Sequence, residues 1–453
     1  MASVRPSVST LLRLAWPMIV SRSTQTVIGI SDSLLVADLG SAAVAATGTG
    51  AFNTFAILIL PMGTMSIVQS FVAQLFGQGD LPGARRYAWY GLVLALQTQL
   101  VCMLGALAVP LALSKFSYAP DVRDLMTRYM QIRLMCGGAA MGIEALGAYY
   151  AGQGNTRLPM IASIFAMVLN VALNWVLIRG HFGAPAMGVP GSALASALAT
   201  WVAFLAFFAF FVRERAPRSN QAFAKSAREY GRMMRFGVPS GLNWFFEFLA
   251  FNVFINVVVA GLGTPALGAM VAVFNINGLS FMPAFGLASA GAILVGQSIG
   301  AGRKDDVPHV LGLTLRTAAM WQAFIGAAYL LVPRLLVAPF ARGEDAAAMM
   351  EVGVRMVMLS SAWQIFDAIG MTTAESLRAA GDTAWPLWAR LALAWGVFFP
   401  GSYVTARVFH GTDVHAMLWI VAYMGLLSLA LWLRFRSGRW RSIELTEPAL
   451  EAA

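Results

Sequence analysis

The sequence predicts an all-α membrane protein with twelve transmembrane helices arranged in two pseudo-symmetric bundles of six. Hydrophobic residues make up 58% of the 453-residue chain and charged residues only 11%, which is too few charges to coat a soluble globule. Apolar stretches long enough to cross a bilayer recur along the whole chain. The second half of the chain also repeats features of the first, as expected for two related bundles.

The repeat is visible as residues that recur at an offset of 222 or 223. The pairs are Pro17 and Pro239, Gly40 and Gly263, Pro61 and Pro283, Gln74 and Gln297, and Gly79 and Gly302. A later echo pairs the tripeptide at 154–156 with the one at 381–383, where the offset has drifted to 227. One folding unit has been duplicated and has diverged. In membrane proteins two such halves commonly enclose a central site, as in many secondary transporters.

Each apolar stretch is expected to be a helix, because backbone amides in lipid need hydrogen-bond partners inside their own segment. The runs do not alternate apolar and polar residues, which excludes a β-barrel. The predicted spans are 11–37, 44–76, 87–113, 126–151, 158–178, 190–212, 236–261, 266–298, 310–333, 350–377, 385–408 and 415–434.

Four of the prolines inside predicted spans recur between the two repeats, two in each repeat. Proline removes a backbone donor and clashes with the preceding turn, so each is expected to kink its helix. Pro17, Pro61, Pro239 and Pro283 are therefore candidate hinges.

Domain boundaries and orientation follow from the basic residues. Residues 1–212 are expected to form the N-terminal six-helix lobe, 213–235 a basic connector, and 236–453 the C-terminal lobe with a short tail. Because Lys and Arg concentrate in cytoplasmic loops, the connector is expected to face the cytoplasm, as are both termini. The predicted location is the inner (cytoplasmic) cell membrane. The connector carries Arg213, Arg215, Arg218, Lys225, Arg228, Arg232 and Arg235.

Several function classes are disfavoured. The net charge of +10 lies in loops beside anionic headgroups, so no nucleic-acid partner is expected. No HExxH, GxSxG or complete Walker motif is present, and an enzyme is not expected. The four histidines lack the spacing of paired metal ligands, so neither a structural metal nor a cofactor is predicted.

Three carboxylates lie well inside apolar spans, where charges are rare and usually face a cavity or a partner. They are Asp32, Glu247 and Asp367. Asn170 and Asn174 form an i, i+4 pair on one helix face. A structural role stays open for all five: the carboxylates could cap kinked helices, and amides commonly link membrane helices.

Further polar residues accompany these carboxylates. Arg22 and Gln25 belong to a polar run that precedes Asp32, so this helix needs a polar surface beside it. Gln364 lies one turn before Asp367. These three residues are candidate cavity-lining positions.

Several sequence blocks resemble the multidrug and toxic compound extrusion (MATE) family, in particular its NorM-type branch. They are DSLLVADLG at 32–40, GQGD at 77–80, GAGRKD at 300–305, LNVALNWVLIRGHFGAPAMGVPGSALA at 169–195, GVPSGLNWFFE ending at Glu247, and LRAAGDT at 377–383. The resemblance covers nearly the whole chain. It implies that Glu247 and Asp367 couple transport to a cation, with Asp32 as a first-half acidic site and Asn170 and Asn174 lining that half.

Two positions bear on how far the resemblance carries. The related DinF-type branch tends to have Asp where this chain has Asn174, which favours coupling in the second half. Arg22 stands where the family more often has a neutral polar residue. A fixed positive charge there could pair with a carboxylate, which would weaken a preference for cationic substrates.

The resemblance and the buried carboxylates together predict an antiporter. It would export hydrophobic cationic small molecules in exchange for H⁺ or Na⁺ by alternating access, with Na⁺ possible at Glu247 and Asp367. The expected partners are an organic substrate and the lipid bilayer, and the chain is expected to be a monomer without a cofactor. The alternative is a flippase for a lipid-linked oligosaccharide or related amphiphile, which Arg22 would suit. A scaffold role would leave the three carboxylates unexplained.

Overall fold

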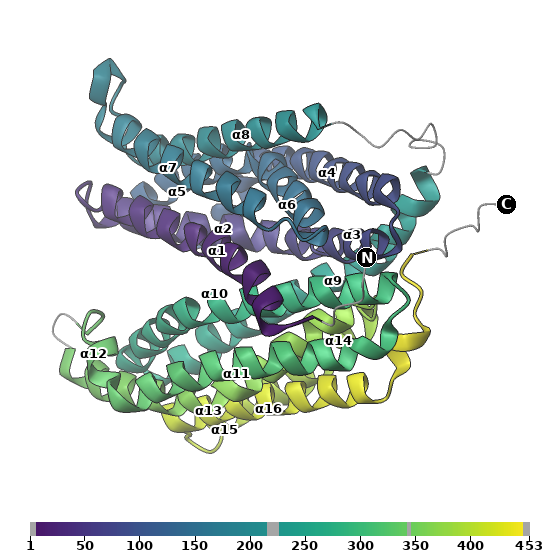
Figure 1. Ribbon diagram of the computed structural model, residues 1–453. Coiled ribbons are helices and arrows are strands. Elements are labelled where there is room, and N and C mark those ends of the chain that lie inside the picture. Colours follow the sequence, from purple (N-terminus) through teal and green to yellow (C-terminus); the bar gives the residue numbers. More distant parts are fainter. Residues whose placement is uncertain (1–5, 215–225, 342–345, 447–453) are drawn as a thin grey trace. The chain divides into compact units, whose positions relative to one another are not determined.

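The computed structural model describes residues 6–214, 226–341 and 346–446 (Figure 1). All regular elements within these ranges are helices. Packing divides the chain into two compact units, which we call the N-terminal unit (Val20–Gly241) and the C-terminal unit (Met1–Ile19 with Leu242–Ala453). Each unit is described separately below.

The N-terminal unit is built from six transmembrane segments. They are α1 (Val8–Ala37), the broken helix α2 (Ser41–Met65) and α3 (Ile67–Gln78), α4 (Leu81–Leu113), the broken helix α5 (Pro120–Leu134) and α6 (Gly137–Gly152), α7 (Arg157–Arg179), and α8 (Val189–Arg213). A short turn, η1 (His181–Gly183), links the last two. The start of α9 (Ser226–Val253) also packs in this unit.

The C-terminal unit repeats this plan. Its elements are the remainder of α9 with η2 (Phe254–Val259) and η3 (Ala260–Leu262), α10 (Thr264–Gly300), η4 (Lys304–Asp306), α11 (Val307–Leu331), α12 (Pro333–Val337), α13 (Ala346–Ala379), α14 (Ala384–Leu393) with η5 (Ala394–Phe398) and α15 (Phe399–Arg407), α16 (Asp413–Arg436) and η6 (Arg439–Ser442). Helix α13 packs against α10, α11 and α16.

The predicted all-α fold with twelve transmembrane segments is confirmed. Most segment boundaries lie within about six residues of the predicted ones, but the seventh segment begins at Ser226, ten residues before the predicted start at 236. In the described residues, seven segments are individually long and apolar enough to cross a membrane. The others are more polar or are broken into shorter helices.

Four predicted spans are interrupted, one of them the seventh, where η2 and η3 follow α9; the other three interruptions each have a local reason. Helix α2 ends four residues after Pro61, whose ring removes a backbone donor. Helices α5 and α6 are separated just before Gly137 and Gly138, which are poor helix formers. In the eleventh segment, η5 is a wide π-helical turn just before Pro400. Proline has no backbone N–H, so a carbonyl oxygen of the preceding turn loses its usual hydrogen-bond donor.

The repeated glycines have matching backbone geometry. Gly40 and Gly263 begin α2 and α10 with φ of 101° and 102°. Gly154 and Gly381 have φ of 86° and 91°. Positive φ is unfavourable for any residue with a Cβ atom, so these turns explain why glycine recurs at the repeat offset.

The packing boundaries differ from the boundaries expected from the sequence. The chain changes unit at Ile19 and again at Gly241, in each case two residues after a repeated proline, Pro17 or Pro239. Residues 6–19 of α1 therefore pack with the C-terminal unit, and 226–241 of α9 with the N-terminal unit. Of the predicted connector 213–235, residues 215–225 lie outside the described residues, and 226–235 form the start of α9.

Candidate functional site

The N-terminal unit holds a buried polar network around Asp32. Asn174 donates through Nδ2 to Asp32 Oδ1 at 2.5 Å and to Asn170 Oδ1 at 3.1 Å. The Ser196 hydroxyl donates to Asp32 Oδ2 at 3.3 Å and accepts from Asn170 Nδ2 at 2.8 Å. All four side chains are at most 6% exposed. The structure thus brings together three predicted residues, from α1 and α7, with Ser196 of α8. We call these four residues the Asp32 network.

Two buried atoms next to this network have no hydrogen-bond partner. They are Asn174 Oδ1 and the Nε of Arg133 on α5, whose guanidinium interacts electrostatically with Asp32. Unpaired polar atoms in a buried site commonly mark a place for water or an ion. The network is therefore polar enough to accept a small guest.

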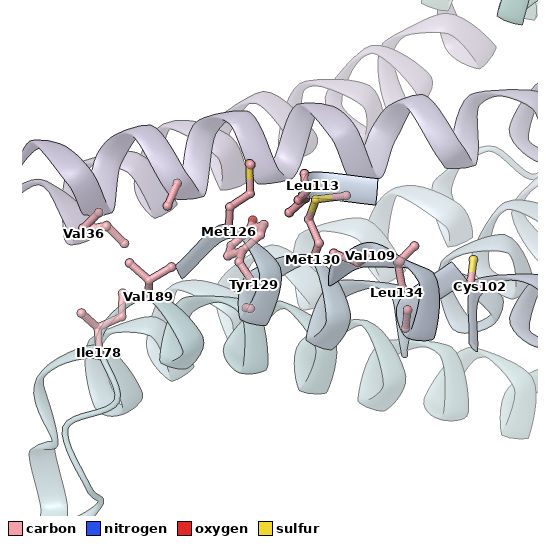
Figure 2. Close-up of a cluster of buried hydrophobic side chains, with 14 residues drawn as sticks. Val36, Cys102, Val109, Leu113, Met126, Tyr129, Met130, Leu134, Ile178 and Val189 are labelled. Carbon is pink, nitrogen blue, oxygen red and sulfur yellow. The ribbon is translucent and has the colours of Figure 1, made fainter. Parts of the chain in front are cut away.

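A cluster of buried hydrophobic side chains includes residues from the three helices that carry the Asp32 network (Figure 2). Val36 lies one helical turn after Asp32 on α1, and Ile178 one turn after Asn174 on α7. Val189 belongs to the same cluster and lies about two turns before Ser196 on α8. Because α8 runs back along the unit, all three aliphatic residues lie on the same side of the carboxylate.

Arg22 is paired within the N-terminal unit. Its Nη1 and Nη2 donate to the Oε1 and Oε2 of Glu144 on α6 at 3.0 and 3.1 Å, and both side chains are about one third exposed. The charge of Arg22 is therefore balanced by a carboxylate other than Asp32, which weakens the basis for a lipid-headgroup carrier. Gln25 lies one turn further along α1 and is exposed. The hydrogen bonds of the Asp32 network described above do not involve it.

In the C-terminal unit, Asp367 lies in a polar seam between α10, α11 and α13. Gln322 of α11 is fully buried and donates through Nε2 to Asp367 Oδ2 at 3.0 Å, while its own Oε1 has no partner. Gln364 is buried one turn before Asp367 and donates to Asn277 Oδ1 of α10 at 2.6 Å. The hydroxyl of Tyr329 reaches the same Asn277 oxygen at 3.3 Å. Asp367 and Gln364, both predicted site residues, thus lie one turn apart on α13, where Asp367 is bonded to α11 and Gln364 to α10.

Glu247 has a different environment. It forms an ion pair with Arg390 of α14, and the arginine is buried while the carboxylate is half-buried. Tyr423 of α16 also lies close enough to Arg390 to interact electrostatically. Arg390 was not among the predicted residues, so the charge next to Glu247 is a new element of the site.

Sequence reasoning missed three ionisable residues that interact with predicted site residues: Arg133 with Asp32, Glu144 with Arg22, and Arg390 with Glu247. The rule that identified Asp32 and Asp367, namely that intramembrane charges are rare and functional or paired, applies equally to these residues. The neutral partners Ser196, Gln322 and Asn277 gave no comparable signal, because serine and amides are ordinary in membrane helices.

The four predicted kink prolines all lie inside helices. Pro17 is in α1, Pro61 in α2, Pro239 in α9 and Pro283 in α10. Their role as hinges remains a prediction.

These sites present carboxylate and amide groups in place of charged clusters. Carboxylate and amide oxygens can bind H⁺ or Na⁺, and neither of these cations needs a preformed cage of charged ligands. In the part of the chain that the structure describes, no group of three or more His, Cys, Asp or Glu side chains lies close enough to hold a metal ion.

Comparison with known proteins identifies one family. The model of the MatE family matches the chain twice, over residues 17–176 and 239–404, in register with the internal repeat. The multidrug resistance protein PmpM of Pseudomonas aeruginosa is 27% identical over 96% of this chain and 92% of its own length. A probable multidrug resistance protein NorM of Thermotoga maritima is 26% identical over 95% of the chain and 92% of its own length.

Solved structures share the fold. A transporter of the MOP superfamily from Pyrococcus furiosus, described as having a binding pocket of reversed polarity, superposes with a TM-score of 0.86 at 19% identity over 97% of this chain and 98% of its own. The outward-facing conformation of a multidrug resistance MATE transporter gives a TM-score of 0.84 at 21% identity, over 97% and 98% of the two chains.

Proposed function

We propose, from the premise that this chain belongs to the MatE family of multidrug efflux transporters, that it exports hydrophobic, cationic small molecules in exchange for H⁺ or Na⁺. The relatives named above are multidrug resistance proteins, which supports drugs or toxins as the substrate class. No cofactor takes part in this scheme, and the chain works as a monomer within the bilayer.

The observation that carries this proposal is the pairing of two carboxylates, the buried Asp32 and the half-buried Asp367, with uncharged donors. Asp32 is bonded to Asn174 and Ser196, and Asp367 to Gln322. An amide or a hydroxyl donates a hydrogen bond without neutralising the carboxylate, so a proton or Na⁺ can still bind; the Arg133 guanidinium, which is not hydrogen-bonded to Asp32, also interacts electrostatically with that carboxylate. Because each carboxylate is bonded to neighbouring helices of its unit, cation binding changes the forces between those helices.

Transport then follows from a shift in populations. If the cation-occupied carboxylates favour one facing of the transporter and the empty ones the other, a cation gradient drives export without contact between ion and substrate. Asp32, Glu247 and Asp367 are the coupling carboxylates in this proposal, and Asn170, Asn174, Arg22, Gln25 and Gln364 are polar residues of the cavities. Aromatic and aliphatic side chains would accept the apolar part of a cationic substrate.

We place the protein in the inner cell membrane with both termini in the cytoplasm. Support comes from the basic residues at the start of α9 and at the end of α16, which include Arg228, Arg232, Arg434 and Arg436. Accessibility of a cysteine introduced near either terminus to an impermeant reagent, in intact and in opened cells, tests this orientation.

The test of function is export in proteoliposomes under separately imposed pH and Na⁺ gradients. We expect efflux of a fluorescent cationic dye to follow one of the two gradients, and Asp367→Asn to abolish the gradient-driven part. Asp121→Asn is the matched control, because this carboxylate is exposed at the first turn of α5. Gradient-driven efflux at the wild-type rate by Asp367→Asn and by Asp32→Asn would remove these residues from the mechanism.

A further inference from the structure

Two of the connections between helices share an unusual backbone conformation. In the described residues a positive φ occurs at ten glycines and at two other residues, Phe182 with φ of 56° and His410 with φ of 50°. Phe182 lies between α7 and α8, and His410 between α15 and α16. A residue with a Cβ atom is strained in this left-handed region, so both places carry a side chain where glycine would relieve the strain.

The two places are equivalent positions of the internal repeat. Phe182 and His410 are 228 residues apart, and so are residues 176 and 404, where the two matches to the MatE family model end. Each connection also carries one phenylalanine and one histidine in opposite order, His181 with Phe182 and Phe409 with His410. We call these two dipeptides the hairpin tips. A strained turn with the same two kinds of side chain therefore occurs once in each unit.

The phenylalanine of each hairpin tip is exposed, by 89% for Phe182 and 74% for Phe409. The ring centroid of Trp175 lies 4.0 Å from that of His181 and 5.6 Å from that of Phe182, yet this contact leaves Phe182 almost uncovered. In Figure 1 the hairpin between α7 and α8 turns away from the turn between α1 and α2 of the same unit. One exposed apolar side chain needs no explanation, but two at equivalent strained turns indicate a partner outside the chain.

The residues that precede each hairpin tip identify this partner. The offset of 228 also pairs Trp175 with Tyr403, which are both 42% exposed, and Arg179 with Arg407, each in the last turn of its helix. Arg179 in addition forms an ion pair with Asp38. Trp and Tyr are enriched where a membrane meets water, and long basic side chains near helix ends extend to that level. This repeated set of residues fits the boundary between lipid headgroups and acyl chains.

The length of α7 brings its tip to that boundary. The helix has 23 residues, which at about 1.5 Å per residue span about 34 Å. The hydrocarbon core of a bilayer is about 30 Å thick, so the end of α7 reaches the headgroups. Gly180, with φ of 78°, ends the helix directly before the tip, so the chain leaves the helix axis at this level.

We propose that the two hairpin tips are membrane-interface anchors, one in each unit, whose Phe182 and Phe409 rings insert between the headgroups and the acyl chains of phospholipids. Trp175 and Tyr403 lie at the same boundary. With both termini in the cytoplasm, the anchored leaflet is the one opposite the cytoplasm, because the tips follow the fifth and the eleventh segments. The anchors go beyond the proposed export and do not depend on it. An absence of dye efflux from proteoliposomes would refute the proposed function and leave the anchors in place.

The test measures the depth of each hairpin tip in a bilayer. The full chain carrying Phe182→Cys or Phe409→Cys is spin-labelled and reconstituted in vesicles of phosphatidylcholine and phosphatidylglycerol. The wild-type chain, whose two cysteines are buried, is the labelling blank. Collisions of the label with oxygen, which concentrates in lipid, are compared with collisions with a water-soluble nickel chelate. Asp121→Cys, exposed at the first turn of α5, is the aqueous reference, and Leu100→Cys, exposed on α4, is the hydrocarbon reference.

We expect the ratio of oxygen to nickel collisions at both tips to be several-fold above the ratio at Asp121→Cys and below that at Leu100→Cys. A ratio equal to the aqueous reference would place the rings in water and overturn the proposal. A low collision rate with both reagents would also overturn it, because it would show that protein, such as a second copy of the chain, covers the tips. A ratio at or above the hydrocarbon reference would contradict an interfacial position.

Because the spin label replaces the ring, a second pair of variants tests the ring itself. Aspartate tolerates a positive φ better than phenylalanine, so Phe182→Asp would be neutral or stabilising if this tip lay in water. An interfacial tip predicts the opposite, a lower unfolding temperature in lipid nanodiscs, because a carboxylate would replace an inserted ring. Phe182→Trp, whose side chain is common at membrane interfaces, should unfold at or above the wild-type temperature. An unchanged or raised unfolding temperature for Phe182→Asp, or an equal fall for both variants, would overturn the proposal.

Discussion

Four buried or half-buried carboxylates divide into two kinds according to their partners. Glu144 and Glu247 each face an arginine, whereas Asp32 and Asp367 are bonded to uncharged side chains. A neighbouring arginine stabilises the ionised form of a carboxylate. An amide donates a hydrogen bond to the carboxylate without neutralising its charge. Of these four carboxylates, Asp32 and Asp367, one in each unit, are therefore the two whose hydrogen-bond donors are uncharged, although Arg133 also interacts electrostatically with Asp32.

The Asp32 network gives a prediction for stability. Asn174→Leu removes the donor to Asp32 Oδ1 and leaves the buried carboxylate with Ser196 as its side-chain donor. We expect the free energy of unfolding to fall by about 1–3 kcal/mol, the usual result of leaving a buried polar group unsatisfied. Unfolding of purified protein in detergent measures this effect. Gln25→Leu, at an exposed position of α1, is the control. Equal stability of the two variants would contradict the network.

At the residue scale the sequence predicts where charges matter and leaves their partners open. Asp32 and Asp367 could be identified because a carboxylate in an apolar span is costly. Their partners lie far away in the chain, Asn174 at a separation of 142 residues and Gln322 at 45. Each carboxylate and its partner are brought together only by the packing of helices. That packing cannot be predicted from a single sequence.

Close packing of α9 on α2 is the clearest example of an element placed by small residues. Gly237 and Gly241 lie one turn apart on α9. A Cβ atom added at Gly241 would lie 2.4 Å from the carbonyl oxygen of Leu60 and 2.3 Å from the hydroxyl of Thr64. Such small-xxx-small steps let two helices approach closely in membranes. The contact lies at the proline-induced break of α2, which keeps the start of α9 in the N-terminal unit.

This contact predicts a position-specific effect of alanine. Gly241→Ala should lower the free energy of unfolding by about 1–3 kcal/mol, because the obstructing Leu60 oxygen belongs to the backbone and cannot rotate away. Gly231→Ala, on the same helix at an exposed position with nothing within 4 Å, should be neutral or stabilising by up to about 1 kcal/mol. Thermal unfolding of the two variants compares them. A Gly241→Ala protein as stable as Gly231→Ala would show that α9 can shift freely on α2.

The repeated prolines predict an effect on rate. Pro17→Ala and Pro239→Ala restore a backbone donor in the middle of α1 and α9 and so stiffen these helices. We expect slower dye export with unchanged or increased thermal stability, since proline in a helix interior is destabilising by about 3 kcal/mol. Initial rates in proteoliposomes measure this. Pro159→Ala, in the first turn of α7 where proline is tolerated, should export at the wild-type rate. Wild-type rates in both kink variants would exclude hinge roles.

At the element scale, periodic breaks in hydropathy predicted all twelve segments, because the bilayer sets a minimum apolar length. The interruptions within segments were less accessible. Pro61 signals the break between α2 and α3, but the π-helical turn η5 depends on how the turn before Pro400 rearranges its hydrogen bonds. The sequence marks such places without specifying their geometry.

At the scale of the whole molecule, the two units do not coincide with the two sequence repeats. Residues 6–19 of the first repeat pack in the C-terminal unit, and 226–241 of the second pack in the N-terminal unit. Within the N-terminal unit this segment of α9 bears Glu229, which accepts hydrogen bonds from Arg86 at 3.1 Å and from Tyr90 at 2.8 Å. The repeat identified in the sequence predicted two lobes, but it gave no sign that they exchange helix ends.

The exchange predicts how the chain can be divided. A fragment of residues 1–241 should be more stable and more uniform in detergent than a fragment of residues 1–212. The longer fragment keeps Glu229 against Arg86 and Phe236 against Phe71. Size-exclusion chromatography and thermal unfolding of the purified fragments make the comparison. If the shorter fragment behaved as well, the start of α9 would be dispensable for the core of the N-terminal unit.

This reciprocal exchange constrains the ancestor of the protein. Each unit is completed by a helix end that belongs to the other copy of the repeat. A single ancestral copy could have covered the same surface only by lending its first helix to a second molecule and receiving one in return. With both copies in one chain that exchange is intramolecular, so it does not depend on protein concentration.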